Sequence, residues 1–257
     1  MRTRRQYLTS LTFILHRYTL NIKGIPYRTV WVEYPDIEAV SKKVGAAPTS
    51  TKPDGSPFYT CPFIYDPNTR TAVSDTVHIA RYLDKTYPDT HQLLPRETAA
   101  LQKAFLRAFA ADVIPGPRGD FFKVMMPPTH ANLNERSQPY FRKTREAMLG
   151  EPLEEIAPKG SEKEKRLWEG ARDGFHAVAE WLDAAGDGGE ETLFFGVDRI
   201  GFADVTVAAF LVWIRCIFGE ESEEWQNVLG WDGGRWARFM QAFKKYEAVD
   251  TGSYAEV

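Results

Sequence analysis

The sequence predicts an α/β domain followed by an all-helical domain, and three observations support this. An apolar run behind Cys61–Pro62, a turn at 66–69 and a second run at 71–73 are typical of a β-hairpin. An amphipathic helical pattern follows this hairpin at once. Beyond Arg96 the apolar residues recur at helical spacing towards the end of the chain. At 257 residues, the chain has ample length for two modest domains.

Upstream of the hairpin, helix and strand patterns alternate. Apolar residues at three- and four-residue steps predict a helix over 10–23, capped by Ser10 or Thr9 and ended by Gly24. The further elements expected are a β-branched, aromatic strand over 27–32, a short helix over 35–44 and a loop over 45–57. In residues 1–9, the arginines leave no strand-like pattern. The element order is therefore that of a thioredoxin-like domain whose first strand is altered or missing.

The stretch around the hairpin offers two groups for binding. Ser74 stands in N-cap position with Asp75 in the first turn, and free amide groups at a helix start can hold a carboxylate. A plain cap is the alternative interpretation of Ser74. The Cys61–Pro62 bond is a candidate cis peptide, although trans is the commoner state. In the cis state the Cys61 backbone would face outward and could pair with an extended peptide. Together these features predict a site for a small peptide that carries a carboxylate.

The helical domain is expected to follow a linker. We predict domains at 1–87 and 97–257 joined by residues 88–96, with these helices in the second: 98–113, 121–126 ended by Pro127–Pro128, 135–149, 161–185 and 200–218. The last helix is apolar on all sides, which indicates a buried central position. Asp204 lies three residues after Gly201, where its carboxylate can accept from the Gly201 amide as part of a capping box.

Composition excludes several classes of function. The charges nearly balance, 32 basic against 35 acidic, so no nucleic-acid partner is predicted. No apolar run reaches the ~18 residues of a membrane span, and the start lacks the pattern of a signal peptide. Two cysteines indicate a reducing, cytoplasmic setting, and the histidine spacing indicates no metal.

Four stretches resemble one family. They are R-Y-T-L-N-I-K-G-I-P-Y (17–27), W-V-E-Y-P-D-I-E (31–38), the hairpin with its S-D and I-A-R-Y-L helix, and I-G-F-A-D-V-T-V-A-A-F (200–210). They resemble the glutathione transferases, in particular the fungal FuA-type, serine-type enzymes that are related to bacterial β-etherases. The resemblance implies glutathione as co-substrate, a homodimer, and either conjugation of glutathione to small hydrophobic aromatic electrophiles or cleavage of aryl ethers.

The resemblance also implies roles for individual residues. The Cys61 backbone beside Pro62 would bind the cysteinyl part of glutathione, Ser74 the γ-glutamyl carboxylate, and Asp75 its amine. Lys52 is a candidate for the glycine carboxylate, with a solvated loop lysine as the alternative. Where the FuA-type pattern has S-P-N-T, only its serine is kept, as Ser10, the candidate catalytic hydroxyl. A simple N-cap is the alternative for Ser10, and Thr9 and Tyr7 are its neighbouring substitutes.

The acceptor pocket is expected between the domains. Its candidate residues are Phe121, Phe122, Met125, Met126 and Trp213, for which core packing is the alternative interpretation. Because no cysteine lies near the first helix start and no C-x-x-C is present, thiol-reducing chemistry is disfavoured. Two rival functions stay open: a non-catalytic binder of hydrophobic aromatics with the same fold, and a scaffold protein that does not bind glutathione.

Overall fold

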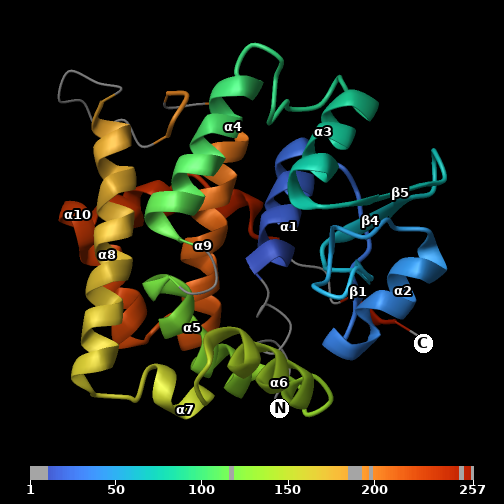
Figure 1. Ribbon diagram of the computed structural model, residues 1–257. Coiled ribbons are helices and arrows are strands. Elements are labelled where there is room, and N and C mark those ends of the chain that lie inside the picture. Colours follow the sequence, from blue (N-terminus) through green and yellow to red (C-terminus); the bar gives the residue numbers. More distant parts are fainter. Residues whose placement is uncertain (1–10, 116–118, 185–192, 197–198, 249–251, 256–257) are drawn as a thin grey trace.

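The computed structural model describes residues 11–115, 119–184, 193–196, 199–248 and 252–255. Its helices α4 to α10 form one body, and the short strands with α2 and α3 form a second body beside it (Figure 1). Helix α1 lies between the two (Figure 1). The predicted combination of a thioredoxin-like domain and a helical domain is confirmed.

Helix α1 (Leu11–Lys23) joins the two bodies through its apolar face. Ile14, Leu15 and Tyr18 are buried in the main core, and α1 packs principally on α9. Gly24 follows with φ +65°, a left-handed conformation that glycine adopts without strain and that ends the helix as predicted. A 3₁₀ turn (Tyr34–Asp36) then leads into α2 (Ile37–Val44), the short helix that the sequence predicts.

Among the described residues, the strands are short and form three separate pairs instead of one continuous sheet. The predicted strand over 27–32 is only β1 (Val30–Trp31). The predicted loop over 45–57 contains a small antiparallel pair, β2 (Ser50–Thr51) with β3 (Pro57–Phe58). The predicted hairpin is confirmed as β4 (Phe63–Asp66) with β5 (Thr71–Ser74).

The sequence pattern predicts helix towards the C-terminus, but residues 253–254 form a strand. The last described residues form strand β6 (Ser253–Tyr254), which pairs in parallel with β1. The Ser253 amide donates to the Thr29 carbonyl at 3.0 Å, and the Ala255 amide donates to the Trp31 carbonyl at 2.9 Å. This pairing joins opposite ends of the sequence, and its hydrogen bonds satisfy backbone groups of β1 that no local pattern could pair.

The helical body surrounds α9. Its elements are α4 (Ala99–Ala108), a π-helical turn (Phe109–Val113), α5 (Asp120–Asn132), α6 (Gln138–Leu149), α7 (Leu153–Ile156), α8 (Glu162–Asp183), α9 (Phe202–Phe218), α10 (Glu223–Gln241) and a 3₁₀ turn (Lys244–Tyr246). Helix α9 is buried along nearly its whole length, as its all-round apolarity predicts. At its start, Asp204 accepts from the amides of Gly201 and Phe194, each at 2.8 Å, which confirms the predicted cap.

The prediction that Pro127–Pro128 end a helix is wrong, because α5 continues through both prolines to Asn132. A proline inside a helix costs roughly 3 kcal/mol through its missing amide and its ring. The packing of α5 on α8 and α9 offsets this cost, with Met125, Met126 and Thr129 buried around the prolines. Asn132 also anchors the last turn through bonds from Nδ2 to the carbonyls of Pro128 (2.8 Å) and Ile217 (3.2 Å).

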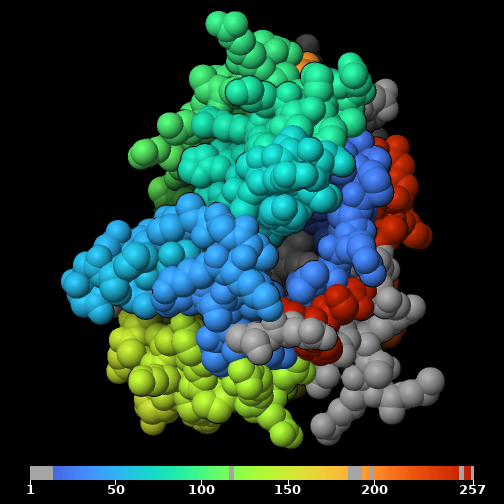
Figure 2. Space-filling view, turned by 90° about the vertical axis from the view of Figure 1, so that its right-hand side faces the viewer, coloured from blue at the N-terminus to red at the C-terminus, as the bar shows by residue number. Residues whose placement is uncertain are grey.

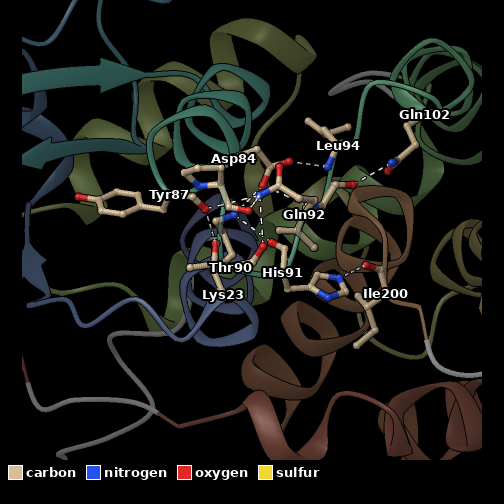
Figure 3. A network of polar contacts seen from close by, with 11 residues as sticks. Lys23, Asp84, Tyr87, Thr90, His91, Gln92, Leu94, Gln102 and Ile200 are labelled. Carbon is tan, nitrogen blue, oxygen red and sulfur yellow. Dashed lines mark hydrogen bonds and ion pairs between the residues drawn. The ribbon is translucent and has the colours of Figure 1, made fainter.

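A buried polar network holds the linker between the two bodies (Figure 3). Lys23 of α1 forms an ion pair with Asp84 of α3 at 2.7 Å and also donates to the His91 carbonyl at 2.9 Å. Asp84 accepts in turn from the Leu94 amide at 2.7 Å. On the helical side, the His91 ring contacts the Ile200 carbonyl at 2.6 Å. The network therefore ties α1, α3, the linker and the start of α9 into one arrangement.

Candidate functional site

The candidate site begins where the chain enters β4. The Cys61–Pro62 peptide bond is cis, as the sequence allowed. β4 and β5 pair with Phe63 opposite Ser74, so the entry to β4 and the end of β5 lie side by side. The Asp75 amide donates to the Pro62 carbonyl at 3.3 Å, which fixes the start of α3 (Thr76–Thr86) against this entry. The hairpin thus brings together residues that lie more than ten positions apart in the chain.

The N-cap of α3 is Asp75, one residue later than predicted. Its Oδ1 accepts from the amides of Val77 (3.0 Å) and His78 (3.4 Å). Asp75 has φ 75° and ψ 137°, a sparsely populated region for a residue other than glycine. Ser and Asp are equally good caps, so the sequence alone does not separate two adjacent candidates. Strand β5 includes Ser74, which leaves capping to Asp75.

Because Asp75 caps the helix, the Ser74 hydroxyl is not needed as the cap and can bind another group. Ser74 is partly buried, and its hydroxyl has no hydrogen bond to any residue that the structure describes. The Thr76 amide likewise has no acceptor within the described part of the chain. The Asp75 amide is already bonded to the Pro62 carbonyl, so it is not one of the free donors. A hydroxyl and an amide at a helix start therefore remain for a ligand carboxylate, next to the carboxylate of Asp75.

The Cys61 side chain is not suited to be a nucleophile. Burial raises the pKa of its thiol to about 12, so the thiol is protonated at neutral pH. Only a thiolate attacks electrophiles or disulfides efficiently. A binding role for Cys61 consequently rests on its backbone and on its place beside Pro62.

Lys52 lies in the turn between β2 and β3, where its amide donates to the Ser56 carbonyl at 2.8 Å. Its Nζ lies 3.6 Å from Glu38, and both side chains are well exposed. Lys42 contacts the same carboxylate more closely, at 2.7 Å. Lys52 therefore has a carboxylate partner within this chain, which weakens the argument that it holds the carboxylate of a ligand.

The five predicted acceptor residues cluster, but mostly inside the core. Phe121, Met125, Met126 and Trp213 are at most 5% exposed, and only Phe122 is partly exposed. The rings of Phe121 and Phe122 each lie within 6 Å of Trp213. This burial corresponds to the alternative interpretation, core packing, for the four buried side chains. Phe122 is the member of the set that retains an accessible surface.

The predicted catalytic residue, Ser10, lies outside the described residues, as do its substitutes Thr9 and Tyr7. Their role stays a prediction. Among the described residues, no three histidine, cysteine or acidic side chains gather in a way that could hold a metal ion. No helix in the described ranges is long and apolar enough to cross a membrane.

The sequence analysis missed the polar seam between the turn after β1 and the start of α6. Glu33 accepts hydrogen bonds from Ser137 and Asn134, and Arg136 forms two bonds with Asp36 at 2.6 and 3.0 Å. In the space-filling view, the segment that includes α2 rests directly on the segment that includes α6 (Figure 2). No local pattern pairs residues a hundred positions apart. Only one side of the seam, Glu33 and Asp36, lies in a stretch (31–38) that the sequence analysis singled out for its family resemblance.

Two surface hollows lie away from the residues of the candidate site. One is lined by His91, Ile200 and the turn at 244–246, and the other lies between α8 and α10 around Trp168 and Trp231. Neither includes Cys61, Ser74 or Asp75. The candidate site is therefore recognised by its open hydrogen-bonding groups.

Comparison with known proteins identifies relatives across the whole fold. Residues 16–86 match the glutathione S-transferase N-terminal domain, and residues 100–246 match the glutathione S-transferase C-terminal domain. A glutathione S-transferase of Ceriporiopsis subvermispora, crystallised in complex with glutathione, is 48% identical, with a TM-score of 0.88 over 94% of this chain and 92% of that one. Glutathione transferase GSTFuA3 of Phanerochaete chrysosporium is 45% identical, with a TM-score of 0.87 over 96% and 94% of the two chains.

A curated relative is more distant. The glutathione S-transferase-like protein ustS of Aspergillus flavus is 28% identical over 88% of this chain and 80% of its own length. The family matches together span most of the described residues and include both sides of the hairpin site and of the linker network.

Proposed function

Since the chain belongs to the glutathione S-transferase family, we propose that it binds glutathione along Cys61–Pro62 and conjugates it to small hydrophobic aromatic electrophiles. The observation that carries the binding proposal is that the Ser74 hydroxyl and the Thr76 amide, beside the Asp75 carboxylate, have no hydrogen-bond partner among the described residues. These groups would receive the γ-glutamyl carboxylate and the α-amine of the tripeptide. The cysteinyl part would then extend along the backbone of Cys61.

The proposed chemistry is activation of the glutathione thiol. A free thiol has a pKa near ~8.5 and is mostly protonated at neutral pH, so the enzyme must favour the thiolate. We assign this task to the Ser10 hydroxyl, which would donate a hydrogen bond to the sulfur. The thiolate then attacks the electrophilic carbon, as in addition to an isothiocyanate, where a C–S bond forms and the isothiocyanate nitrogen takes up a proton. Cleavage of an aryl ether would use the same thiolate with an aryloxide as leaving group.

The alternative is a protein of the same fold that binds hydrophobic aromatics without turnover. The altered pattern around Ser10, where the S-P-N-T of similar enzymes is not kept, supports this alternative. A homodimer, as the resemblance implies, and a cytoplasmic location, as the cysteine content indicates, are part of the proposal. Light scattering of the purified protein measures the oligomeric state directly.

Two measurements test the proposal. Calorimetry gives the dissociation constant of glutathione, and turnover of benzyl isothiocyanate gives kcat/KM. We expect Ser74→Ala to weaken glutathione binding about tenfold, which corresponds to one lost hydrogen bond to a charged group. Ser10→Ala should reduce kcat with little change in glutathione affinity.

Ser161→Ala is the matched control. The Ser161 hydroxyl caps α8 by accepting from the Glu164 amide at 3.1 Å, so its loss should lower stability by about 1 kcal/mol and leave glutathione affinity unchanged. Glutathione binding without turnover would favour the alternative function. Full activity of Ser10→Ala would remove Ser10 from the mechanism, and unchanged binding by Ser74→Ala would refute the site.

A further inference from the structure

One arginine at the seam between the domains has no carboxylate partner among the described residues. Arg145 on α6 is partly buried, yet no carboxylate within the described residues pairs with it. Its only hydrogen bond there runs from Nη1 to the Thr144 hydroxyl at 2.9 Å. The other partly buried arginines each pair with an acidic side chain: Arg142 with Glu154, Arg215 with Glu247 and Arg235 with Asp183. Because a partly buried cation normally has a counter-charge, the exception within the described residues points to one that a ligand can supply.

Aromatic rings hold the Arg145 guanidinium in place. Its central carbon lies 4.6 Å from the centre of the Phe141 ring and 5.7 Å from the centre of the Tyr34 ring. An arginine stacked on aromatic faces keeps its N–H donors in the plane of the guanidinium, where they can form paired bonds with a carboxylate. The group is thus oriented in advance for an anion.

Two phenol hydroxyls accompany the guanidinium. Tyr34 and Tyr140 stack with ring centres 6.1 Å apart, and Tyr34 also packs edge-on against Phe141 at 5.7 Å. Neither hydroxyl forms a hydrogen bond with any described residue, while the Tyr34 amide is anchored to the Ser137 hydroxyl at 3.0 Å. The ring of Tyr34 is consequently fixed from the helical domain, and its hydroxyl remains available as a donor.

The cluster lies near the proposed glutathione site. Burial raises the pKa of Tyr34, the Arg145 charge lowers it, and the neighbouring Cys61 and Tyr140 groups raise it further. Cys61 is the residue whose backbone would receive the cysteinyl part of glutathione. Tyr34 is thus close enough to Cys61 to interact with it electrostatically, and in the proposed binding mode Cys61 meets the cysteinyl part of the tripeptide while Ser74 and Asp75 hold its γ-glutamyl end.

We propose that Arg145, Tyr34 and Tyr140 form a carboxylate-binding subsite for the substrates, with Arg145 as the counter-charge and the phenols as additional donors. The subsite rests on the proposed function for its ligands. Its carboxylate can come from two sources, the glycyl end of glutathione or an acidic acceptor molecule. Arg145 has no acidic partner in the part of the chain that the structure describes, whereas Lys52 and Lys42 share Glu38, so Arg145 is the better cation for this role.

The experiment uses Arg145→Met and Tyr34→Phe, with Lys143→Met as control. Lys143 is an exposed cation two positions earlier on the same helix, so its loss reproduces the change in net charge alone. The ligands are glutathione and its glycyl monoethyl ester, measured by calorimetry. The acceptors are benzyl isothiocyanate and its 4-carboxylate derivative, measured by kcat/KM.

Either of two results supports the subsite. A loss of at least tenfold in affinity for glutathione, with the ester unaffected, assigns the carboxylate to the glycyl end. A tenfold loss in kcat/KM confined to the carboxylated isothiocyanate assigns it to the acceptor. Tyr34→Phe should reproduce the same selectivity with a smaller effect, because it removes one hydroxyl and keeps the ring.

Changes below twofold in both series, or equal losses for charged and uncharged ligands, would overturn the inference. If no variant and not even the native protein turned over an isothiocyanate, the proposed catalysis would fail. The calorimetric comparison of glutathione with its ester would still test Arg145, so the two failures are distinguishable.

Discussion

Replacement of Asp75 by asparagine separates two roles of one carboxylate. Its Oδ1 caps α3 through the amides of Val77 and His78, and we propose that the carboxylate also binds the α-amine of glutathione. Asparagine is an equally good N-cap and has the size and shape of the aspartate that adopts φ 75° and ψ 137° here. The substitution therefore keeps the cap and removes the negative charge.

The two effects differ in size. Loss of the charge at the helix start costs about 0.5 kcal/mol of stability, because the amide oxygen still accepts from the first turn. A charge-assisted hydrogen bond to an ammonium group contributes about 1.5–3 kcal/mol. The Asp75 side chain is 46% exposed, so solvent screening reduces this contribution to about 1–2 kcal/mol. Glutathione should then bind Asp75→Asn about 5- to 30-fold more weakly.

Calorimetry and thermal unfolding of the same samples measure both quantities. Des-amino glutathione, which lacks the α-amine, is the ligand control: it should bind the native protein and Asp75→Asn equally well. Asp75→Ala should lose the cap as well and unfold at a lower temperature than Asp75→Asn. A dissociation constant for glutathione within twofold of the native value would refute the amine contact. A loss that extended to des-amino glutathione would show that the substitution disturbs the site as a whole.

Three further predictions concern buried or paired charges. Lys23→Met should cost about 3–5 kcal/mol in urea unfolding because it leaves Asp84 buried without its cation, and a cost below 1 kcal/mol would contradict this. Asp204→Ala should cost about 1–2 kcal/mol. Burial raises the pKa of Asp204 to about 7. The contribution of Asp204 to stability is therefore complete below its unfolded pKa of ~4, where the side chain is protonated in both states, and it declines as the pH rises towards ~7. The cost should consequently be larger at pH 5 than at pH 8, and equal costs would argue against it. The hydrogen bond that His176 donates to the Asp232 carboxylate raises the pKa of His176, so the stability from this pair is complete below the ordinary histidine pKa and is lost as pH rises through the raised value. An NMR titration should give His176 a midpoint above its ordinary value that returns to it in Asp232→Asn, and equal midpoints would exclude the pair.

Features that depend on local pattern could be predicted from the sequence. The β4–β5 hairpin follows from its turn residues, and α9 follows from apolarity on every side. The Asp204 cap follows from a three-residue spacing, because a helix start places those two groups together in any fold. Each of these signals lies within about twenty consecutive residues and needs no knowledge of distant partners.

Features that depend on competition between neighbours were harder to predict. At Ser74–Asp75 two good capping residues are adjacent, and the pairing of β5 decides which one caps. At Pro127–Pro128 the local rule predicts a helix end, but burial against α8 and α9 outweighs it. Strand β6 is formed by pairing with β1, which is distant in the sequence, so the residues at 253–254 alone could not predict it.

The contrast between Arg142 and Arg145 extends this argument to function. Both are partly buried arginines on the amphipathic helix α6, three positions apart. Arg142 contacts Glu146 and Glu154, two carboxylates that this chain provides. Arg145 instead turns towards Tyr34, a residue of the other domain, where aromatic faces but no carboxylate of a described residue contact it. A sequence records that both arginines are present, whereas only the arrangement of the domains shows which one still lacks a counter-charge. That missing charge is the reason to expect a carboxylate from the substrates at the seam, and substitution of Arg145 alone is sufficient to test it.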